Sequence, residues 1–266
     1  MAGKEQRDPS PVKAAIAVLI LSACTGLSPL RGRAVVGRDA YVIFVGDGPG
    51  GQADLFAVRA DGGPVFQVTF TNVVEAAPAL SPDGGAVAFL RARTTRDSVP
   101  AALWVLNLLS GAERELPPPP GVGPPERVGW SPDGKLIYVR AGSARYALPA
   151  PPAVAPARLL GKGEHAAADS SLAVLLGDPP FGRVVPCDHA LCVQGDSGAP
   201  SPFAENAHDA VRWGADSVGF ISGGDLVVRP LGPGRGRRVE WSGVPARPRE
   251  MTAFLGRSEK GEVRSE

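Results

Sequence analysis

Two stretches of the chain share one pattern, in which Ser-Pro-Asp-Gly stands between two apolar runs. Pro78–Leu90 reads PALSPDGGAVAFL, and Val128–Arg140 reads VGWSPDGKLIYVR. In the shared Ser-Pro-Asp-Gly, proline fixes φ at the second turn position, aspartate suits the third, and glycine accepts a positive φ at the fourth. Because an apolar run stands on each side of the turn, each stretch predicts two antiparallel strands joined by a tight turn. The fold must therefore accommodate this unit more than once.

A third strand is expected after such pairs. Asp54–Gly63, Ala102–Gly111 and Asp225–Gly234 align without gaps, with leucine in the second column and glycine in the last, and a short fourth run follows each. A weaker copy of the first pair stands at Val211–Ile221, and a degenerate copy at His165–Leu176. The unit is then a four-stranded meander of about 40 to 50 residues, which is the period of a propeller blade.

These repeats resemble the TolB-type, WD-like β-propeller repeats, which also form the propellers of prolyl-oligopeptidase-like enzymes. The resemblance rests on DLFAVRADGG, QVT and APALSPDGGAVAFL, in that order along the chain. We therefore expect an all-β fold, a single β-propeller of four-stranded antiparallel blades, with five blades and six as the alternative. The resemblance also implies a role in an envelope complex, or as an accessory subunit of a membrane assembly.

The propeller is expected over residues 41–255. It follows a signal peptide at residues 1–23 and a linker at 24–40, and a flexible polar tail is expected at 256–266. The 34 glycines and 28 prolines stand between short apolar runs, as in chains with many strands and turns.

The first unit lacks a strand of its own. We expect that strand from Arg33–Val36, or from the C-terminal segment Glu250–Leu255 folding back to close the ring. Closure by a terminal strand would remove the two exposed sheet edges of an open array.

The N-terminus carries an export signal. Lys4, Arg7 and Lys13 precede the apolar run Ala14–Leu21, which is too short to span a membrane but suits the core of a signal peptide. The sequence LSAC that ends at Cys24 resembles the bacterial lipobox, in which the cysteine is lipidated and becomes the mature N-terminus. The alternative is a plain secretory signal with a chance cysteine.

The resemblance to the lipobox implies a bacterial periplasmic protein that is anchored to a membrane by lipid on Cys24. It favours the outer membrane over the inner one, because threonine rather than aspartate follows the cysteine. Multiple acyl chains on one residue would hold the protein stably.

The two other cysteines form a candidate pair. Cys187 and Cys192 flank the four residues Asp188–Leu191, so a hairpin would set them opposite one another, close enough for a disulfide. In an oxidising periplasm we expect that disulfide as a structural staple. A metal site made from the two thiols and His189 is the alternative, although a fourth ligand with recognisable spacing is missing.

The segment Gly195–Pro200, which reads GDSGAP, resembles the surroundings of the nucleophilic serine in chymotrypsin-like proteases. That mechanism needs a general-base histidine far upstream in a double barrel. The chain has only His165, His189 and His208, and none has the family's neighbours. We expect Ser197 to lie in a polar loop between the strands of blades four and five.

Composition narrows the function further. With 28 Lys+Arg against 27 Asp+Glu and a net charge of +1, no global field draws the chain to nucleic acid.

We expect a non-catalytic interaction or scaffold module for a protein partner of the cell envelope, with no cofactor, metal or catalytic residue. The alternatives are a propeller enzyme, such as a lactonase or glycan lyase, and a small-ligand binder that uses tryptophans. A histidine and two carboxylates meeting at the propeller axis would favour the enzyme.

Overall fold

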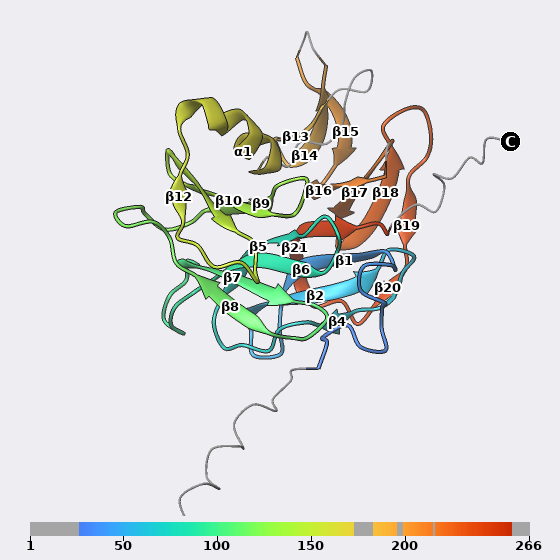
Figure 1. Cartoon of the computed structure of the whole chain (residues 1–266). Coiled ribbons are helices and arrows are strands. Elements are labelled where there is room, and N and C mark those ends of the chain that lie inside the picture. The colour runs from blue at the N-terminus through green and yellow to red at the C-terminus, as the bar shows by residue number, and fades with distance from the viewer. Residues whose placement is uncertain (1–26, 173–182, 196–198, 215, 257–266) are drawn as a thin grey trace, which may run out of the picture.

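The computed structural model describes residues 27–172, 183–195, 199–214 and 216–256. Six sheets form in these residues, and four of them have four strands. The described residues form a β-propeller with five blades, with inner strands around the centre and outer strands at the periphery (Figure 1). From the inner to the outer strand, blade 1 consists of β21 (Ala246–Phe254), β1 (Tyr41–Asp47), β2 (Ala53–Arg59) and β4 (Phe66–Gln67), and blade 2 consists of β5 (Glu75–Leu80), β6 (Ala86–Arg91), β7 (Ala102–Asn107) and β8 (Glu113–Leu116). In the same order, blade 3 consists of β9 (Arg127–Trp130), β10 (Leu136–Ala141), β11 (Ala144–Pro149) and β12 (Arg158–Leu159), and blade 4 consists of β13 (Arg183–Cys187), β14 (Ala190–Gln194) and β15 (Ser201–Glu205). Blade 5 consists of β16 (Ala207–Trp213), β17 (Ser217–Ser222), β18 (Asp225–Pro230) and β19 (Arg237–Val239).

The sixth sheet is a parallel pair that links blade 5 to blade 1. It joins β20 (Trp241–Ser242) to β3 (Gly63–Pro64). The expectation of an all-β propeller with antiparallel blades is thus confirmed, whereas blade 4 has three strands in its described part rather than four.

The repeated turns form as predicted. In blade 2, Ser81 Oγ donates to Asp83 Oδ1 at 2.6 Å, and Ser81 Oγ accepts the N–H of Ala86 at 2.9 Å. Gly84 has a φ of +69°, a conformation that side chains other than glycine rarely adopt. The turn at Ser131–Gly134 repeats this geometry in blade 3. Each turn thereby fixes the register of the strand pair that it joins.

The C-terminal strand closes the ring. β21 pairs antiparallel with β1, and Phe254 stands opposite Tyr41. The two rings also pack together, with centroids 5.7 Å apart. Of the two strands considered for this position, the C-terminal segment is the one used, and Arg33–Val36 forms no strand.

Apolar clusters fill the spaces between neighbouring blades. One cluster joins blades 1 and 2 around Ile43, Leu55 and Phe89, and another joins blades 2 and 3 around Leu103 and Ile137. A third cluster joins blades 5 and 1. The four tryptophans are partly buried and pack against these three clusters: Trp104, Trp130, Trp213 and Trp241. They pack between blades rather than forming one exposed platform.

The part of the expected linker that the structure describes packs against the propeller. Leu30 is fully buried in the cluster between blades 1 and 2. Ser28 Oγ donates to the carbonyl of Leu108 at 2.6 Å. The propeller therefore begins its contacts at least a dozen residues before β1.

The prediction of strands within His165–Leu176 is wrong. The chain forms η1 (Lys162–Glu164) and α1 (His165–Leu172), and residues 173–176 lie outside the described part. The run of three alanines favours a helix, and the buried Ala168 and Leu172 lie one turn apart on the face that packs against blade 3.

Glycine makes room for that helix. A Cβ placed on Gly129 of β9 would overlap the carbonyl of Ser171. The helix therefore rests directly on the inner strand of blade 3.

Candidate binding pocket at the propeller centre

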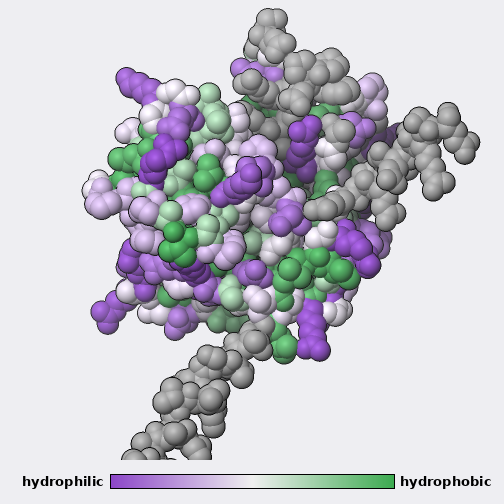
Figure 2. All heavy atoms as spheres, in the orientation of Figure 1, coloured by the Kyte–Doolittle hydropathy of each residue, from purple (hydrophilic) through white to green (hydrophobic). Residues whose placement is uncertain are grey.

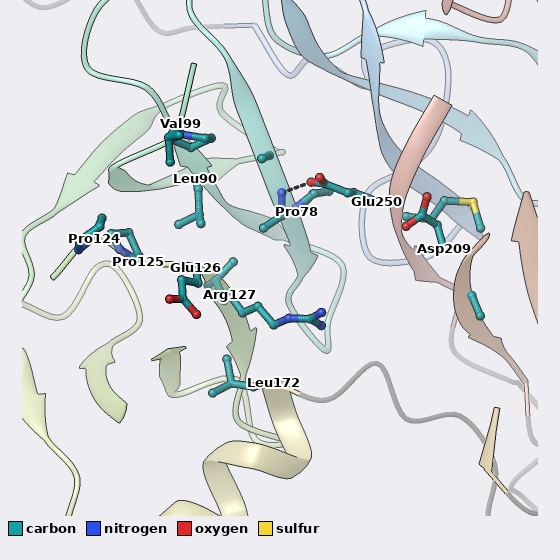
Figure 3. Close-up of a pocket in the computed structure, with 16 residues that line it drawn as sticks. Pro78, Leu90, Val99, Pro124, Pro125, Glu126, Arg127, Leu172, Asp209 and Glu250 are labelled. Carbon is teal, nitrogen blue, oxygen red and sulfur yellow. Dashed lines mark hydrogen bonds between the residues drawn. The ribbon is translucent and has the colours of Figure 1, made fainter. Parts of the chain in front are cut away.

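The inner strands of four blades surround a cavity of about 650 Å³ (Figure 3). β5, β9, β16 and β21 line it together with α1 and the loops that precede β7 and β9. Its walls are mainly apolar, and they include Pro78, Leu90, Val99, Pro124, Pro125 and Met251. The size and the apolar lining are those of a site for a small molecule or for a few residues of a peptide.

Three of the inner strands are bulged where they reach the pocket. The ladder between β5 and β6 skips Ala77, the one between β16 and β17 skips Asp209, and the one between β21 and β1 skips Glu250. These three residues have φ of 51°, 53° and 53°, which is unusual for residues other than glycine. They occupy equivalent positions in their blades, and all three line the pocket. Bulges re-aim side chains and cluster at functional sites, so this repeated strain marks the pocket as a site.

Glu250 links two of the bulges. Its carboxylate accepts the backbone N–H of Ala77, so the bulge of blade 1 is held to the bulge of blade 2. Next to this contact, Thr252 Oγ1 accepts the N–H of Leu80 at 3.1 Å. Glu250 thus has a structural partner as well as a place in the pocket wall.

Asp209 is held by its neighbour in the chain. His208 Nδ1 lies 2.5 Å from Asp209 Oδ2, and the exposed His208 does not itself line the pocket. A proton on His208 Nδ1 is required for this hydrogen bond, because an ionised carboxylate only accepts.

Arg127 is the cation of the pocket. It follows Pro125 and Glu126 at the start of β9, and its guanidinium extends toward the centre of the cavity (Figure 3). Within the described part of the chain, the guanidinium of Arg127 makes neither a hydrogen bond nor an ion pair. Glu126 instead turns to blade 3, where it accepts the N–H of Gly142 at 3.1 Å and pairs with Arg140 at 3.3 Å. The free guanidinium is available to an anionic or carbonyl group of a ligand.

A buried charge network holds the strand ends beside the pocket. Glu75 is fully buried at the start of β5, and Arg91 at the end of β6 reaches it at 2.8 Å. Arg91 also binds Glu113 through two hydrogen bonds of 2.7 and 2.9 Å, and its guanidinium lies 4.6 Å from the ring centroid of Trp104. Burial raises the pKa of Glu75, while the hydrogen bond from Thr69 and the charge of Arg91 oppose that rise.

Sequence reasoning missed this network. Glu75 and Arg91 are cross-strand partners. Glu75 begins the first strand and Arg91 ends the second strand of the pair that is joined by the turn at Ser81. Opposite charges at these two positions are the sequence signal that could have predicted the ion pair.

The histidines partly meet the stated criterion for an enzyme. His208 is hydrogen-bonded to one carboxylate of the pocket, and Glu250 supplies a second. His165 lies on α1 with its Nε2 3.3 Å from the carbonyl of Leu160, and His189 is exposed in the turn between β13 and β14. Among the residues that the structure describes, no three histidine, cysteine or acidic side chains are grouped to hold a metal ion.

The predicted disulfide between Cys187 and Cys192 is present, with the Cα atoms 5.9 Å apart. Its register differs from the expectation, since Cys187 stands opposite Ala190 and Cys192 opposite Val185. The turn is shorter than expected because only Asp188 and His189 separate the paired residues, and the bridge runs diagonally. Both thiols are consumed, so they form no metal site with His189.

Two predicted sites fall outside the described residues, namely Cys24 and Ser197. The strands on either side of Gly195–Pro200 are β14 and β15 of one sheet. The prediction that this segment connects blades 4 and 5 is therefore wrong, because the strands on its two sides belong to blade 4. None of the described helices is long and apolar enough to cross a membrane.

No family model matches the chain, and no curated protein matches it. Solved structures with a similar fold include TolB from Acinetobacter baumannii, with 12% identity, a TM-score of 0.42, and coverage of 80% of this chain and 66% of that one. A nidogen/laminin complex matches with 10% identity and a TM-score of 0.49 over 82% of this chain and all of that one.

A putative 6-phosphogluconolactonase from Bacteroides uniformis matches with 15% identity and a TM-score of 0.30, over 76% of this chain and 67% of that one. The class of fold that the sheets define is the β-propeller. At this level of identity the likeness concerns the fold.

Proposed function

We propose that the chain is a lipid-anchored periplasmic protein whose propeller is a non-catalytic interaction module, with the central pocket holding a segment of a protein partner in the cell envelope. The pocket is the observation that carries this proposal. Its walls are apolar and rich in proline, and Glu250 and Asp209 each have a partner in the described chain. Groups with such partners hold the pocket in shape, whereas Arg127 is left to meet a ligand.

The test is capture of a partner from detergent-solubilised envelopes. We expect Arg127→Glu to lose the partner, because it reverses a charge of the pocket wall and breaks no side-chain hydrogen bond or ion pair with a described residue. Arg237→Glu is the matched control, since Arg237 is exposed on the outer strand of blade 5 and away from the pocket. Equal capture by both variants, or no capture by the wild type, would count against the proposal.

The lipid attachment is tested separately. Mass spectrometry of the N-terminal peptide should find acyl chains on Cys24, and Cys24→Ala should release the protein from the membrane fraction. An unmodified N-terminus at Cys24, with the protein still in the membrane, would contradict the anchor.

A propeller enzyme is the second candidate, because the His208–Asp209 pair and Glu250 place a potential general base beside an apolar pocket. In this case lactone or glycan turnover should disappear in both His208→Gln and Asp209→Asn, with partner capture unchanged. Absence of turnover in the wild type over a panel of lactones and acidic glycans would argue against it.

A further inference from the structure

The described chain begins on the opposite side of the propeller from the pocket. Ser28 is hydrogen-bonded to Leu108, which directly follows the end of β7. The pocket residues Val99 and Pro100 lie in the loop just before the start of the same strand, one residue away from it. The two sites are therefore separated by the length of a six-residue strand, about 20 Å.

We call the surface that carries the chain start the anchor face. It consists of residues 27–38 and the turns at 81–85 and 108–111. The turns are joined to one another by the hydrogen bond from the N–H of Leu108 to the carbonyl of Gly85, at 2.9 Å. The anchor face is thus part of blades 1 and 2 and moves with them.

The position of Cys24 constrains this face. Cys24 is three residues before Leu27, the first described residue. Three residues reach at most about 11 Å even when fully extended. A lipid on Cys24 would therefore hold the anchor face close to the headgroups, while the pocket, one strand length away, would open toward the periplasm.

The composition of the anchor face suits a membrane surface. Leu27 is 70% exposed and Leu109 is 64% exposed, and their chain neighbours Ser28 and Leu108 are joined by a hydrogen bond. Figure 2 shows hydrophobic atoms beside the point where the described chain begins. Exposed apolar groups at a surface next to an anchor favour insertion at the boundary between headgroups and acyl chains.

Basic side chains accompany these leucines. Arg31, Arg33 and Arg38 are exposed, and the anchor face has one acidic residue in its defined ranges, Asp83, with Asp39 directly beyond residue 38. Arg38 pairs with Asp39, while Arg33 lies over the ring of Phe66. Basic residues beside a lipid anchor favour anionic headgroups.

We propose that the anchor face binds the surface of the bilayer that holds Cys24, so that the propeller is fixed with its pocket directed away from that membrane. This inference rests on the proposed lipid attachment, and it goes beyond it by assigning the membrane as a second partner of the folded propeller itself.

The test compares two positions of matched exposure at opposite ends of β7. Leu109 and Val99 are 64% and 65% exposed. Each is replaced by cysteine in the lipidated protein and labelled with a fluorophore without reductant, since Cys187 and Cys192 are already bridged. In vesicles whose headgroups carry a quencher, we expect Leu109→Cys to be quenched several-fold more than Val99→Cys. Equal quenching, or stronger quenching at Val99→Cys, would overturn the orientation.

The outcomes separate this proposal from the lipid attachment. If mass spectrometry finds Cys24 acylated and the two probes are quenched equally, the anchor stands and the orientation is wrong. If Cys24 is not acylated, the lipid attachment itself fails and the orientation falls with it.

A second experiment tests the basic residues of the anchor face. The Cys24→Ser chain is mixed with phosphatidylcholine vesicles that contain or lack phosphatidylglycerol. Arg31→Gln and Arg33→Gln should each weaken binding to the anionic vesicles about fivefold, the equivalent of roughly 1 kcal/mol per basic residue at such a surface. Arg96→Gln, on the exposed loop before β7 at the pocket side, is the matched control and should leave binding unchanged. The same effect at all three positions would contradict the proposed face.

Discussion

Replacing Arg91 with methionine removes the cation that the buried carboxylate of Glu75 faces. Glu75 is fully buried and the Arg91 side chain is 9% exposed, so water cannot take the place of the guanidinium. Breaking a buried pair from one side costs about 3 to 5 kcal/mol, because the remaining charge stays in a medium that solvates it poorly. Lost contact of the guanidinium with the rings of Phe89 and Trp104 adds to that cost by roughly 1 kcal/mol.

The loss of stability in Arg91→Met should depend on pH, and the direction of that dependence follows from the pKa of Glu75. Burial already raises the pKa of Glu75, and Arg91 counteracts that rise. Without Arg91 the folded-state pKa rises further above the unfolded value. The ionised form then destabilises the fold above that pKa, while protonation relieves the penalty as the pH falls toward the unfolded value. We therefore expect the loss of stability to be largest near pH 8 and to shrink toward pH 5.

Urea denaturation of the wild type and Arg91→Met at several pH values measures this. Glu75→Leu combined with Arg91→Met is the matched control, because it removes both charges and should recover most of the lost stability. A loss below about 1 kcal/mol at pH 8, or a loss that is the same from pH 5 to pH 8, would refute the argument that Arg91 compensates a desolvated carboxylate.

Three further outcomes are expected. Cys187→Ser with Cys192→Ser should lower the free energy of unfolding by about 2 kcal/mol, the loop-closure value for so short a loop, as measured by urea denaturation, and no change would show that the hairpin holds without the bridge. Gly129→Val should cost about 1 to 3 kcal/mol, since its side chain would push α1 away at Ser171; faster proteolysis near the helix would check this, and wild-type resistance would contradict it. Deletion from residue 246 onward removes β21 and exposes the edge of β1, so size-exclusion chromatography should show association, and a stable monomer would be the contrary result.

The features that follow from local chemistry were predictable. The turns at Ser81 and Ser131 specify their own geometry through residue types, and the repeat period then specifies the blade. The C-terminal strand was predictable as one of two ways to close the ring. The disulfide was predictable as a pair, although its diagonal register depends on a two-residue turn that the sequence does not distinguish from a longer one.

The pocket was not predictable in the same way. Ala77, Asp209 and Glu250 share a backbone conformation but no residue type, so nothing in their identities marks the equivalent bulges. The helix α1 stands where a strand was expected: its alanine-rich run favours a helix, and Gly129 leaves the space in which that helix packs on β9. Both misses concern geometry that tertiary contacts impose.

The pairing of β21 with β1 has a consequence for how the molecule is made. Synthesis begins at the N-terminal end, so Tyr41 is made long before Phe254, its partner across the two strands. Until then β1 has an open edge, and the pocket lacks the wall that Glu250 and Met251 provide. The pocket is therefore complete only when the C-terminal strand has been made and has paired with β1.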